Sequence, residues 1–237
     1  MKIRLLETGA SNAFMNMAID EVLMESKEPI LRLYSWKPPA VSIGYFQNLN
    51  EEIDVGACER LGVDIIRRQT GGGAVFHDKE LTYSFITREY PKNILESYSW
   101  ICLAIIEGLR TVGFTAQFAP LNDIVIGGKK ISGNAQTRRD GVLLQHGTIL
   151  LDVDVDKMFS ILKVPNEKMK GKLISDVKER VAGLGISFEK TGTAMKKGFE
   201  KSMGAELIES ELSIAEKEKA IKLSEEKYRT EGWLHRV

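Results

Sequence analysis

The sequence predicts an α+β protein whose core is a mixed, mostly antiparallel β-sheet flanked by helices. Strand-like segments gather in the first two thirds of the chain, glycine turns join neighbouring strands, and candidate helices dominate from about residue 154. Strands and helices do not alternate regularly, so a doubly wound parallel sheet is not expected. At 237 residues, we expect one domain over 1–237 with a helical C-terminal region at about 154–237.

The N-terminal third predicts two helices and three strands. Ser11 or Asn12 can cap a helix that runs to about Glu25, because apolar residues repeat there at helical spacing. Two strands are expected on either side of Lys37-Pro38-Pro39, as a hairpin, and a short helix follows that ends at Gly62. The ranges of these later elements are 30–36 and 40–46 for the strands, 54–61 for the helix, and 63–68 for a strand that leads into three glycines.

The rest of the chain predicts a strand, a long helix, a meander and a set of helices. Residues 81–87 alternate as in a strand, and a long helix follows Pro91 and ends at Gly113. Glycine-containing turns separate three antiparallel strands at 123–126, 129–136 and 142–153. The helices are expected near 154–163, 173–182, 190–203 and 213–228, the last with a capping box formed by Ser213 and Glu216.

Composition excludes several classes of protein. Lys plus Arg and Asp plus Glu both total 33, so no broad positive field favours nucleic acid. No apolar run is long enough to cross a membrane, and the N-terminus lacks the pattern of a secretory signal, so we expect a cytoplasmic protein. Cys58 and Cys102 lie far apart without metal-site spacing, and the three histidines likewise share no such spacing. A disulfide framework and a structural metal are therefore not expected.

The segment RRQTGGGAVFHD, residues 67–78, carries the strongest local signal. Three consecutive glycines, Gly71, Gly72 and Gly73, let the backbone approach a ligand and present amides to an anion, and Arg68 could bind a phosphate. A flexible turn is the alternative. The segment is neither a P-loop nor a dinucleotide fingerprint, because GK[ST], GxGxxG and a following helix are missing. His77 could close a pocket wall or be a structural residue.

The second informative segment is LNDIVIGGKKISGNAQ, residues 121–136. Strict alternation places Lys130, Ser132 and Asn134 on one strand face and Ile131, Gly133 and Ala135 on the other. A lysine opposite Asn122 and Asp123 would suit the stabilisation of charge on an acyl phosphate. A solvent-exposed strand face is the alternative, although a strand glycine such as Gly133 often marks a close approach. His146 and Thr148, on the third strand, would line a site or the polar side of the sheet.

Together these segments resemble the lipoate-protein ligase A family, within the lipoate and biotin protein ligases. The motifs RRxxGGGAVFHD and NDI…GxKISGNA carry the resemblance. It extends from the early helix through RLYSW…SIGYFQN to LISDVKERVAGL, and so covers most of the chain. The resemblance implies a catalytic domain like that of class II aminoacyl-tRNA synthetases and biotin ligases.

The resemblance also implies an activity. Such enzymes use ATP with Mg²⁺ to convert lipoic acid into lipoyl-AMP, and then acylate a lysine of a lipoyl carrier domain. The acceptor would be the E2 subunit of a 2-oxoacid dehydrogenase or the glycine cleavage H protein. Lys130 would be catalytic, and Asp123 could meet Mg²⁺. The implied lipoate- and ATP-binding residues are Arg68, Gly71, Gly72, Gly73, Ala74, Val75, Phe76, His77, Asn122, Asp123, Ser132, Gly133 and His146.

Three questions stay open at this point. Many bacterial relatives carry a C-terminal accessory domain that this chain lacks, so it would act alone or with a small separate accessory subunit. An octanoyltransferase of the same fold would need a reactive cysteine, but neither Cys58 nor Cys102 is adjacent to Lys130 in sequence, and the insert of such enzymes is missing before Asn122. A non-catalytic lipoate-binding subunit is a third alternative, and a biotin ligase is disfavoured because its GRGRxGR-type loop is missing.

Overall fold

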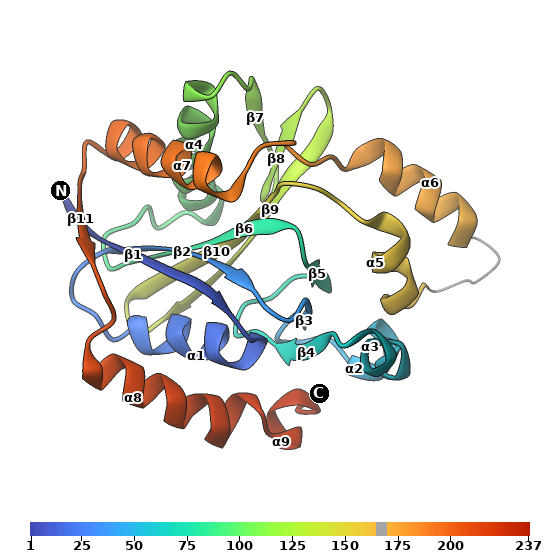
Figure 1. The fold of residues 1–237 in the computed structure, drawn as a ribbon. Coiled ribbons are helices and arrows are strands. Elements are labelled where there is room, and N and C mark those ends of the chain that lie inside the picture. The colour runs from blue at the N-terminus through green and yellow to red at the C-terminus, as the bar shows by residue number, and fades with distance from the viewer. Residues whose placement is uncertain (165–169) are drawn as a thin grey trace.

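The computed structural model describes residues 1–164 and 170–237 and shows two β-sheets with helices packed around them (Figure 1). The eight-stranded sheet has the order β11-β1-β2-β6-β10-β9-β8-β7, and the three-stranded sheet has the order β4-β3-β5. In the larger sheet β11, β1 and β2 run parallel, and every other neighbouring pair is antiparallel. The predicted α+β class with a mostly antiparallel sheet is confirmed. Residues 165–169 of the predicted helical region lie outside the described residues.

The strands and helices are numbered in chain order. The strands are β1 (Lys2–Ser11), β2 (Ile30–Trp36), β3 (Ala40–Ile43), β4 (Asp64–Arg67), β5 (Val75–His77), β6 (Glu80–Thr87), β7 (Ala116–Ala119), β8 (Asp123–Ile126), β9 (Lys129–Arg139), β10 (Val142–Leu150) and β11 (Glu206–Ser210). The helices are α1 (Ala13–Leu23), α2 (Leu49–Glu52), α3 (Val55–Leu61), α4 (Ile94–Thr111), α5 (Val155–Ile161), α6 (Lys170–Arg180), α7 (Phe188–Met203), α8 (Ile214–Leu223), the π-helical turn η2 (Ser224–Tyr228) and α9 (Glu231–Leu234).

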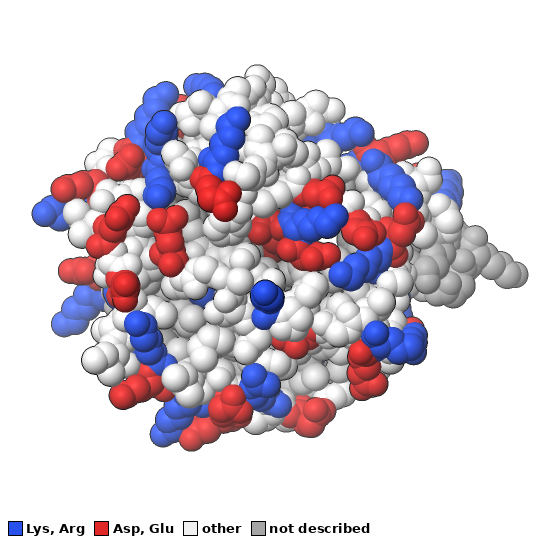
Figure 2. All heavy atoms as spheres, in the orientation of Figure 1, with Lys and Arg blue, Asp and Glu red and all other residues white. Residues whose placement is uncertain are grey.

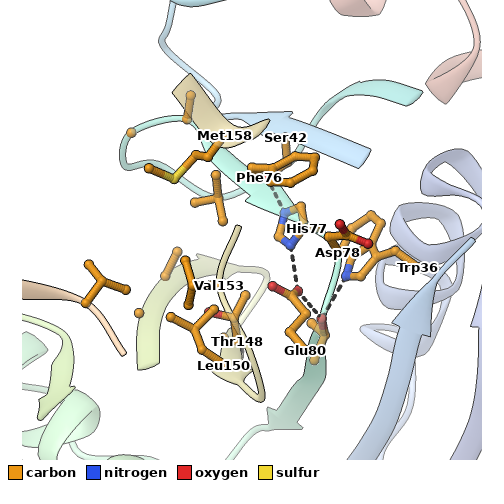
Figure 3. Close-up of a pocket in the computed structure, with 18 of the residues that line it drawn as sticks. Trp36, Ser42, Phe76, His77, Asp78, Glu80, Thr148, Leu150, Val153 and Met158 are labelled. Atoms are coloured by element: carbon orange, nitrogen blue, oxygen red, sulfur yellow. Dashed lines mark hydrogen bonds and ion pairs between the residues drawn. The ribbon is translucent and has the colours of Figure 1, made fainter. Parts of the chain in front are cut away.

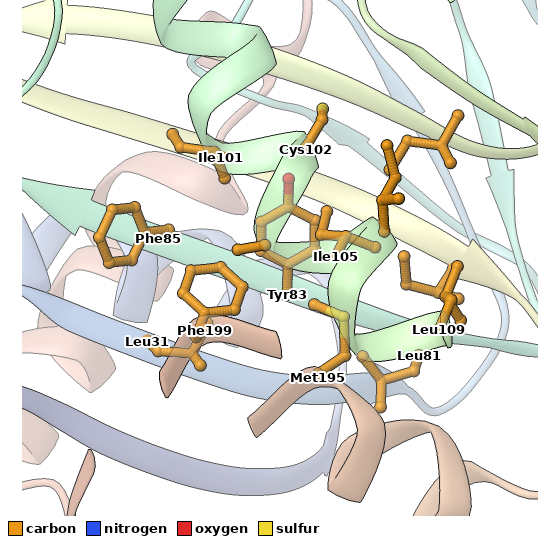
Figure 4. Close-up of a cluster of buried hydrophobic side chains, with 14 of the residues drawn as sticks. Leu31, Leu81, Tyr83, Phe85, Ile101, Cys102, Ile105, Leu109, Met195 and Phe199 are labelled. Carbon is orange, nitrogen blue, oxygen red and sulfur yellow. The ribbon is translucent and has the colours of Figure 1, made fainter. Parts of the chain in front are cut away.

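Helices α4 and α7 cover one face of the large sheet and enclose the main core (Figures 1 and 4). Leu31 of β2 and Tyr83 and Phe85 of β6 pack there against Ile105 of α4 and Phe199 of α7. The two helices approach very closely. A Cβ added at Gly198 would lie 2.0 Å from the Ala104 carbonyl oxygen, so glycine is required at this crossing.

Helices α1 and α8 cover the opposite face (Figure 1). The Asn12 side chain caps α1 by accepting from the Met15 amide, which selects Asn12 from the two predicted caps. The predicted capping box of Ser213 and Glu216 is confirmed at the start of α8. Arg4 of β1 forms an ion pair with Glu216 at 2.6 Å and so links the large sheet to α8.

The expected hairpin of residues 30–36 and 40–46 is wrong. Strand β2 pairs with β1 and β6 in the large sheet, whereas β3 pairs with β4 and β5 in the small one. The intervening Pro38 and Pro39 offer no N–H for ladder pairing, and the chain passes there from one sheet to the other. This crossing places Ser42 of β3 beside β5, with its hydroxyl 2.8 Å from His77 Nε2.

Four strands were not predicted. Strand β1 carries a bulge between Glu7 and Gly9, β5 and β7 are only three and four residues long, and β11 is a polar, largely exposed edge strand. None therefore shows the clean alternation that identifies a strand in sequence. The predicted meander is confirmed as β8, β9 and β10. Its turns require left-handed conformations at Gly127, Gly128 and Asp140.

The surface carries mixed charge on the face seen in Figure 2, where acidic and basic side chains are interspersed. This agrees with the equal totals of the two kinds of residue in the sequence. Among the helices of the described ranges, none combines the length and the apolar character that a membrane span requires.

We predict that Gly198→Ala lowers the free energy of unfolding by about 1–3 kcal/mol, because the added methyl group must separate α7 from α4. Gly192→Ala is the matched control in the same helix, where the new Cβ meets only side-chain atoms at 3.7–3.9 Å. That change should be neutral or stabilising by up to about 1 kcal/mol. Urea unfolding measures both. Equal effects of the two changes would contradict the proposed role of the close crossing.

Candidate functional site

A cavity of about 490 Å³ opens where the two sheets and α5 meet (Figure 3). Its volume lies in the range of small-molecule sites. One wall is the glycine-rich segment with β5, a second is formed by β9 and β10, and a third is apolar. The apolar residues are Phe76, Leu150, Val153, Met158, Phe159, Leu162, Val177 and Val181.

Arg68 holds the glycine-rich segment in place through hydrogen bonds. Its side chain is 5% exposed, and it donates to the Gly71 and Gly73 carbonyls at 2.8 and 2.7 Å. Its remaining N–H groups reach the Thr70 hydroxyl and both oxygens of Ser42. All five donors of the guanidinium are thus used by the protein. The expectation that Arg68 bonds a phosphate directly is therefore not supported by this geometry.

Glycines allow this tight arrangement. Gly72 has a φ of 95°, and a Cβ at Gly44 would lie 2.0 Å from the Gly72 carbonyl oxygen. A larger residue would be strained at Gly72 and would clash at Gly44.

Burial lowers the pKa of Arg68 to about 10, so the group still carries its charge at neutral pH. Among the described side chains no carboxylate pairs with it, which leaves a positive field under the segment.

A buried polar cluster supports the same segment and was missed in the sequence. Asp20 accepts from Arg32 at 2.7 Å and lies 3.4 Å from His146 Nδ1. Thr70 Oγ1 accepts from Arg68 Nε and lies 2.7 Å from His146 Nε2. His146 therefore connects the glycine-rich segment to the sheet. The sequence did carry a signal for this cluster. Asp20 stands within the apolar pattern of helix α1, and Arg32 stands within the apolar pattern of strand β2.

Lys130 reaches the cavity because of a bulge in β9. Ile124 pairs with Ser132, whereas Val125 pairs with Lys130, so Ile131 is an extra residue. The bulge puts Lys130 and Gly133 on one face, against the predicted strict alternation. A Cβ at Gly133 would lie 2.9 Å from Lys130 Nζ, so this glycine makes room for the lysine side chain.

The environment of Lys130 is ionic and partly open. Its Nζ lies 2.8 Å from Asp123 Oδ1, and the two side chains are 41% and 32% exposed. Asn122 and Asn134 join β8 to β9 beside it, since Asn134 Nδ2 donates to the Asn122 carbonyl at 2.8 Å and Asn122 Nδ2 donates to the Asn134 carbonyl. The lysine is thus held at the cavity rim, where a large partner can reach it.

Most of the predicted site residues meet at this cavity. Three predicted residues do not line it. Gly71 lines a second cavity, and Asp123 forms an ion pair with Lys130. Ser132 is fully buried, and its hydroxyl accepts a hydrogen bond from Asn134. The residues that line the main cavity as predicted are Arg68, Gly72, Gly73, Ala74, Val75, Phe76, His77, Asn122, Lys130, Gly133 and His146. Ser132 was misplaced because the bulge reverses the faces of β9.

Neither a reactive thiol nor a preformed metal site accompanies these residues. Burial raises the pKa of Cys58 to about 11 and that of Cys102 to about 12, and both side chains are fully buried outside the cavity lining. Within the described part of the chain, no three His, Cys, Asp or Glu side chains converge as metal ligands.

The mixed sheet and the glycine-walled cavity with a lysine at its rim define an α+β enzyme with a small-molecule site. A family model described as the lipoyl protein ligase A/B catalytic domain matches residues 12–200. The chain belongs to this family.

Similar proteins fall into two groups. The octanoyltransferase LipM of Kyrpidia tusciae is 38% identical over 98% of this chain and 98% of the relative, and that of Bacillus subtilis is 35% identical over 97% and 96%. Among solved structures, a bipartite lipoate-protein ligase from Thermoplasma acidophilum has a TM-score of 0.91 at 33% identity, covering 100% of this chain and 96% of that one. A lipoate-protein ligase A bound with ATP has a TM-score of 0.88 at 31% identity, covering 99% of both chains.

His146 should make stability depend on pH. Its pKa lies below the ordinary 6.5, since burial disfavours the charged ring more than Asp20 favours it. The unfolded chain therefore binds a proton first as pH falls, and stability is lost from about pH 6.5 downwards until the folded-state pKa is passed. The loss should not exceed about 1.4 kcal/mol per pH unit. Urea unfolding of His146→Gln from pH 7.5 to 5 should show a smaller slope than the wild type, and an unchanged slope would contradict this account.

Proposed function

We propose that residues 1–237 form one catalytic domain that joins lipoate to a lysine of a lipoyl carrier domain with ATP as the energy source. One observation carries this proposal: a partly exposed lysine shares a cavity with the glycine-rich segment, while both thiols lie elsewhere. A cationic group beside backbone amides suits a reaction in which negative charge develops on a phosphate and a carbonyl oxygen. No protein nucleophile is required for such a reaction.

In the first step a lipoate carboxylate oxygen attacks the α-phosphorus of ATP, and the bond to pyrophosphate breaks. Lys130 would release Asp123 and stabilise the charge on the α-phosphate. The amides of the glycine-rich segment, over the positive field of Arg68, would hold the same group. A Mg²⁺ ion carried by the nucleotide would neutralise the departing pyrophosphate.

In the second step the carrier lysine attacks the carbonyl carbon of lipoyl-AMP, an amide bond forms and AMP leaves. Lys130 would then stabilise the developing charge on the carbonyl oxygen. The apolar wall of the cavity excludes water from the mixed anhydride until the carrier docks. The exposure of Lys130 at the rim is consistent with a macromolecular acceptor.

Solved relatives support the ligase. One similar structure, a lipoate-protein ligase A, is bound with ATP, and a lipoate-protein ligase from T. acidophilum is bound with lipoic acid, with a TM-score of 0.85 at 30% identity. The bipartite ligase of that organism belongs to a lipoylation system together with its E2 lipoyl domain. These relatives favour an E2 lipoyl domain as the acceptor, and a ligase made of two separate parts, for the present chain as well.

The curated relatives favour the second candidate, an octanoyltransferase, better than the ligase. Eight relatives of that name match at 34–38% identity. A transferase that forms a thioester needs a reactive thiolate next to the acyl group. Here both thiols have raised pKa values and lie outside the cavity lining. The alignments extend over 268–270 positions against 237 residues, so those relatives carry segments without a counterpart in this chain.

A reconstituted assay separates the candidates. The ligase predicts that lipoate, ATP, Mg²⁺ and a lipoyl domain give a mass increase on the acceptor together with pyrophosphate, with or without an added accessory subunit. The double variant Cys58→Ala/Cys102→Ala should keep this activity within about 2-fold, because neither thiol touches the cavity. Transfer from octanoyl carrier protein without ATP, abolished in a folded double variant, would establish the transferase. No adenylate and no transfer with every subunit added would favour a binding subunit.

Lys130→Ala should reduce acceptor modification by about 10²–10³-fold, as when one stabilising donor of developing charge is removed. Its control is Lys129→Ala, the neighbouring exposed lysine outside the cavity lining, which should keep full activity. Thermal unfolding checks that both variants fold. Normal turnover by Lys130→Ala would refute the assigned role.

Gly133→Ala should displace Lys130 without unfolding the sheet, since the new methyl group meets the flexible end of that side chain at 2.9–3.0 Å. Misplacement by about 1 Å can cost roughly 10²-fold in rate. We therefore expect a fall in kcat for acceptor modification at nearly unchanged thermal stability. An unaltered kcat would show that the position of the ammonium group is not critical.

A further inference from the structure

A chain of hydrogen bonds in the cavity wall ends on one oxygen of Glu80 (Figure 3). The indole N–H of Trp36 donates to Thr82 Oγ1 at 2.7 Å, and that hydroxyl donates to Glu80 Oε1 at 2.6 Å. His77 Nδ1 lies 2.7 Å from the same oxygen. The His77 ring is also stacked on Trp36, with centroids 4.1 Å apart. These contacts fix the carboxylate in one orientation.

The donors and acceptors determine the direction of this chain. Arg68 Nη1 donates to Ser42 Oγ at 3.1 Å, and the same hydroxyl lies 2.8 Å from His77 Nε2. A carboxylate oxygen only accepts hydrogen bonds, so His77 Nδ1 carries a proton and donates it to Glu80 Oε1. Glu80 Oε1 thus receives two donors, one from each side.

The other oxygen, Oε2, is buried and receives no hydrogen bond from any described residue. Glu80 is 3% exposed, and it lines the main cavity. Figure 3 shows its carboxylate between His77 on one side and Thr148, Leu150 and Val153 on the other. An unpaired buried carboxylate oxygen is costly, and a ligand that brings an N–H group would remove that cost.

The geometry points to Glu80 as the specificity-determining residue that accepts a hydrogen bond from the amino group of the nucleotide base. This inference rests on the proposed use of ATP. The base would lie against the apolar wall of Phe76, Leu150 and Val153, with its amino edge towards Oε2. The hydrocarbon chain of an acyl group has no N–H or O–H, so it would leave Oε2 unpaired.

The test compares ATP with purine riboside 5′-triphosphate, which lacks only the base amino group. Calorimetric titration with Mg²⁺ and without lipoate avoids turnover. We expect the wild type to bind ATP about 10-fold or more tightly than the analogue, as for a hydrogen bond to a charged acceptor. In Glu80→Gln, His77 and Thr82 hold the amide oxygen, so the NH₂ group faces the cavity. ATP should then lose its advantage, while binding of the analogue changes little.

Glu89→Gln, an exposed carboxylate beyond the other end of β6, is the control and should keep the wild-type preference. Equal binding of both nucleotides by the wild type, or an unchanged preference in folded Glu80→Gln, would overturn the inference. A third nucleotide, 2′-deoxy-ATP, tests the ribose, and loss of sugar discrimination alone in Glu80→Gln would also overturn it. If the wild type binds no nucleotide, the proposed function fails with it, whereas binding without base preference refutes only the role of Glu80.

Discussion

The buried guanidinium of Arg68 is the constraint on which the site depends. It holds two carbonyls of the glycine-rich segment and both oxygens of Ser42, and its charge has no carboxylate partner among the described side chains. The segment is therefore an ordered wall with a positive field beneath it. Two chains of hydrogen-bonded groups start from the Arg68 guanidinium. One runs through Thr70 to His146 and the other through Ser42 to His77. Arg68 thus positions the backbone of the segment and supports both histidines.

Lys130 depends on a second constraint, the extra residue in β9. The bulge turns the lysine towards the cavity, Gly133 gives it room, and Asp123 holds it in place until a substrate arrives. Because the groups that line the site are then a lysine and a set of amides, the site suits an acyl adenylate better than a protein thioester. The chemistry of the site favours a ligase, whereas the similar octanoyltransferases favour a transferase. The two candidates differ physically in what they require of the two thiols, which here are buried with raised pKa values.

The sequence predicted the sheet class, the meander and the convergence of most site residues, since long apolar periods and glycine turns act locally. The predictions from the sequence were wrong where contacts between distant segments determine the structure. The two strands around Pro38 were assigned to one hairpin although they join different sheets, and Ser132 was placed in the site because an alternation rule cannot reveal a bulge. Glu80 and Asp20 were missed, since only the fold shows that their partners come from distant segments.

The most direct test of the account is a crystal structure of the chain with lipoate and an ATP analogue whose α,β-bridging oxygen is replaced by methylene. The account predicts that Lys130 leaves Asp123 and that its Nζ lies about 3 Å from both the lipoate carboxylate and the α-phosphate, above the glycine-rich segment. A nucleotide bound elsewhere, or a lysine still paired with Asp123 when both ligands occupy the cavity, would contradict it.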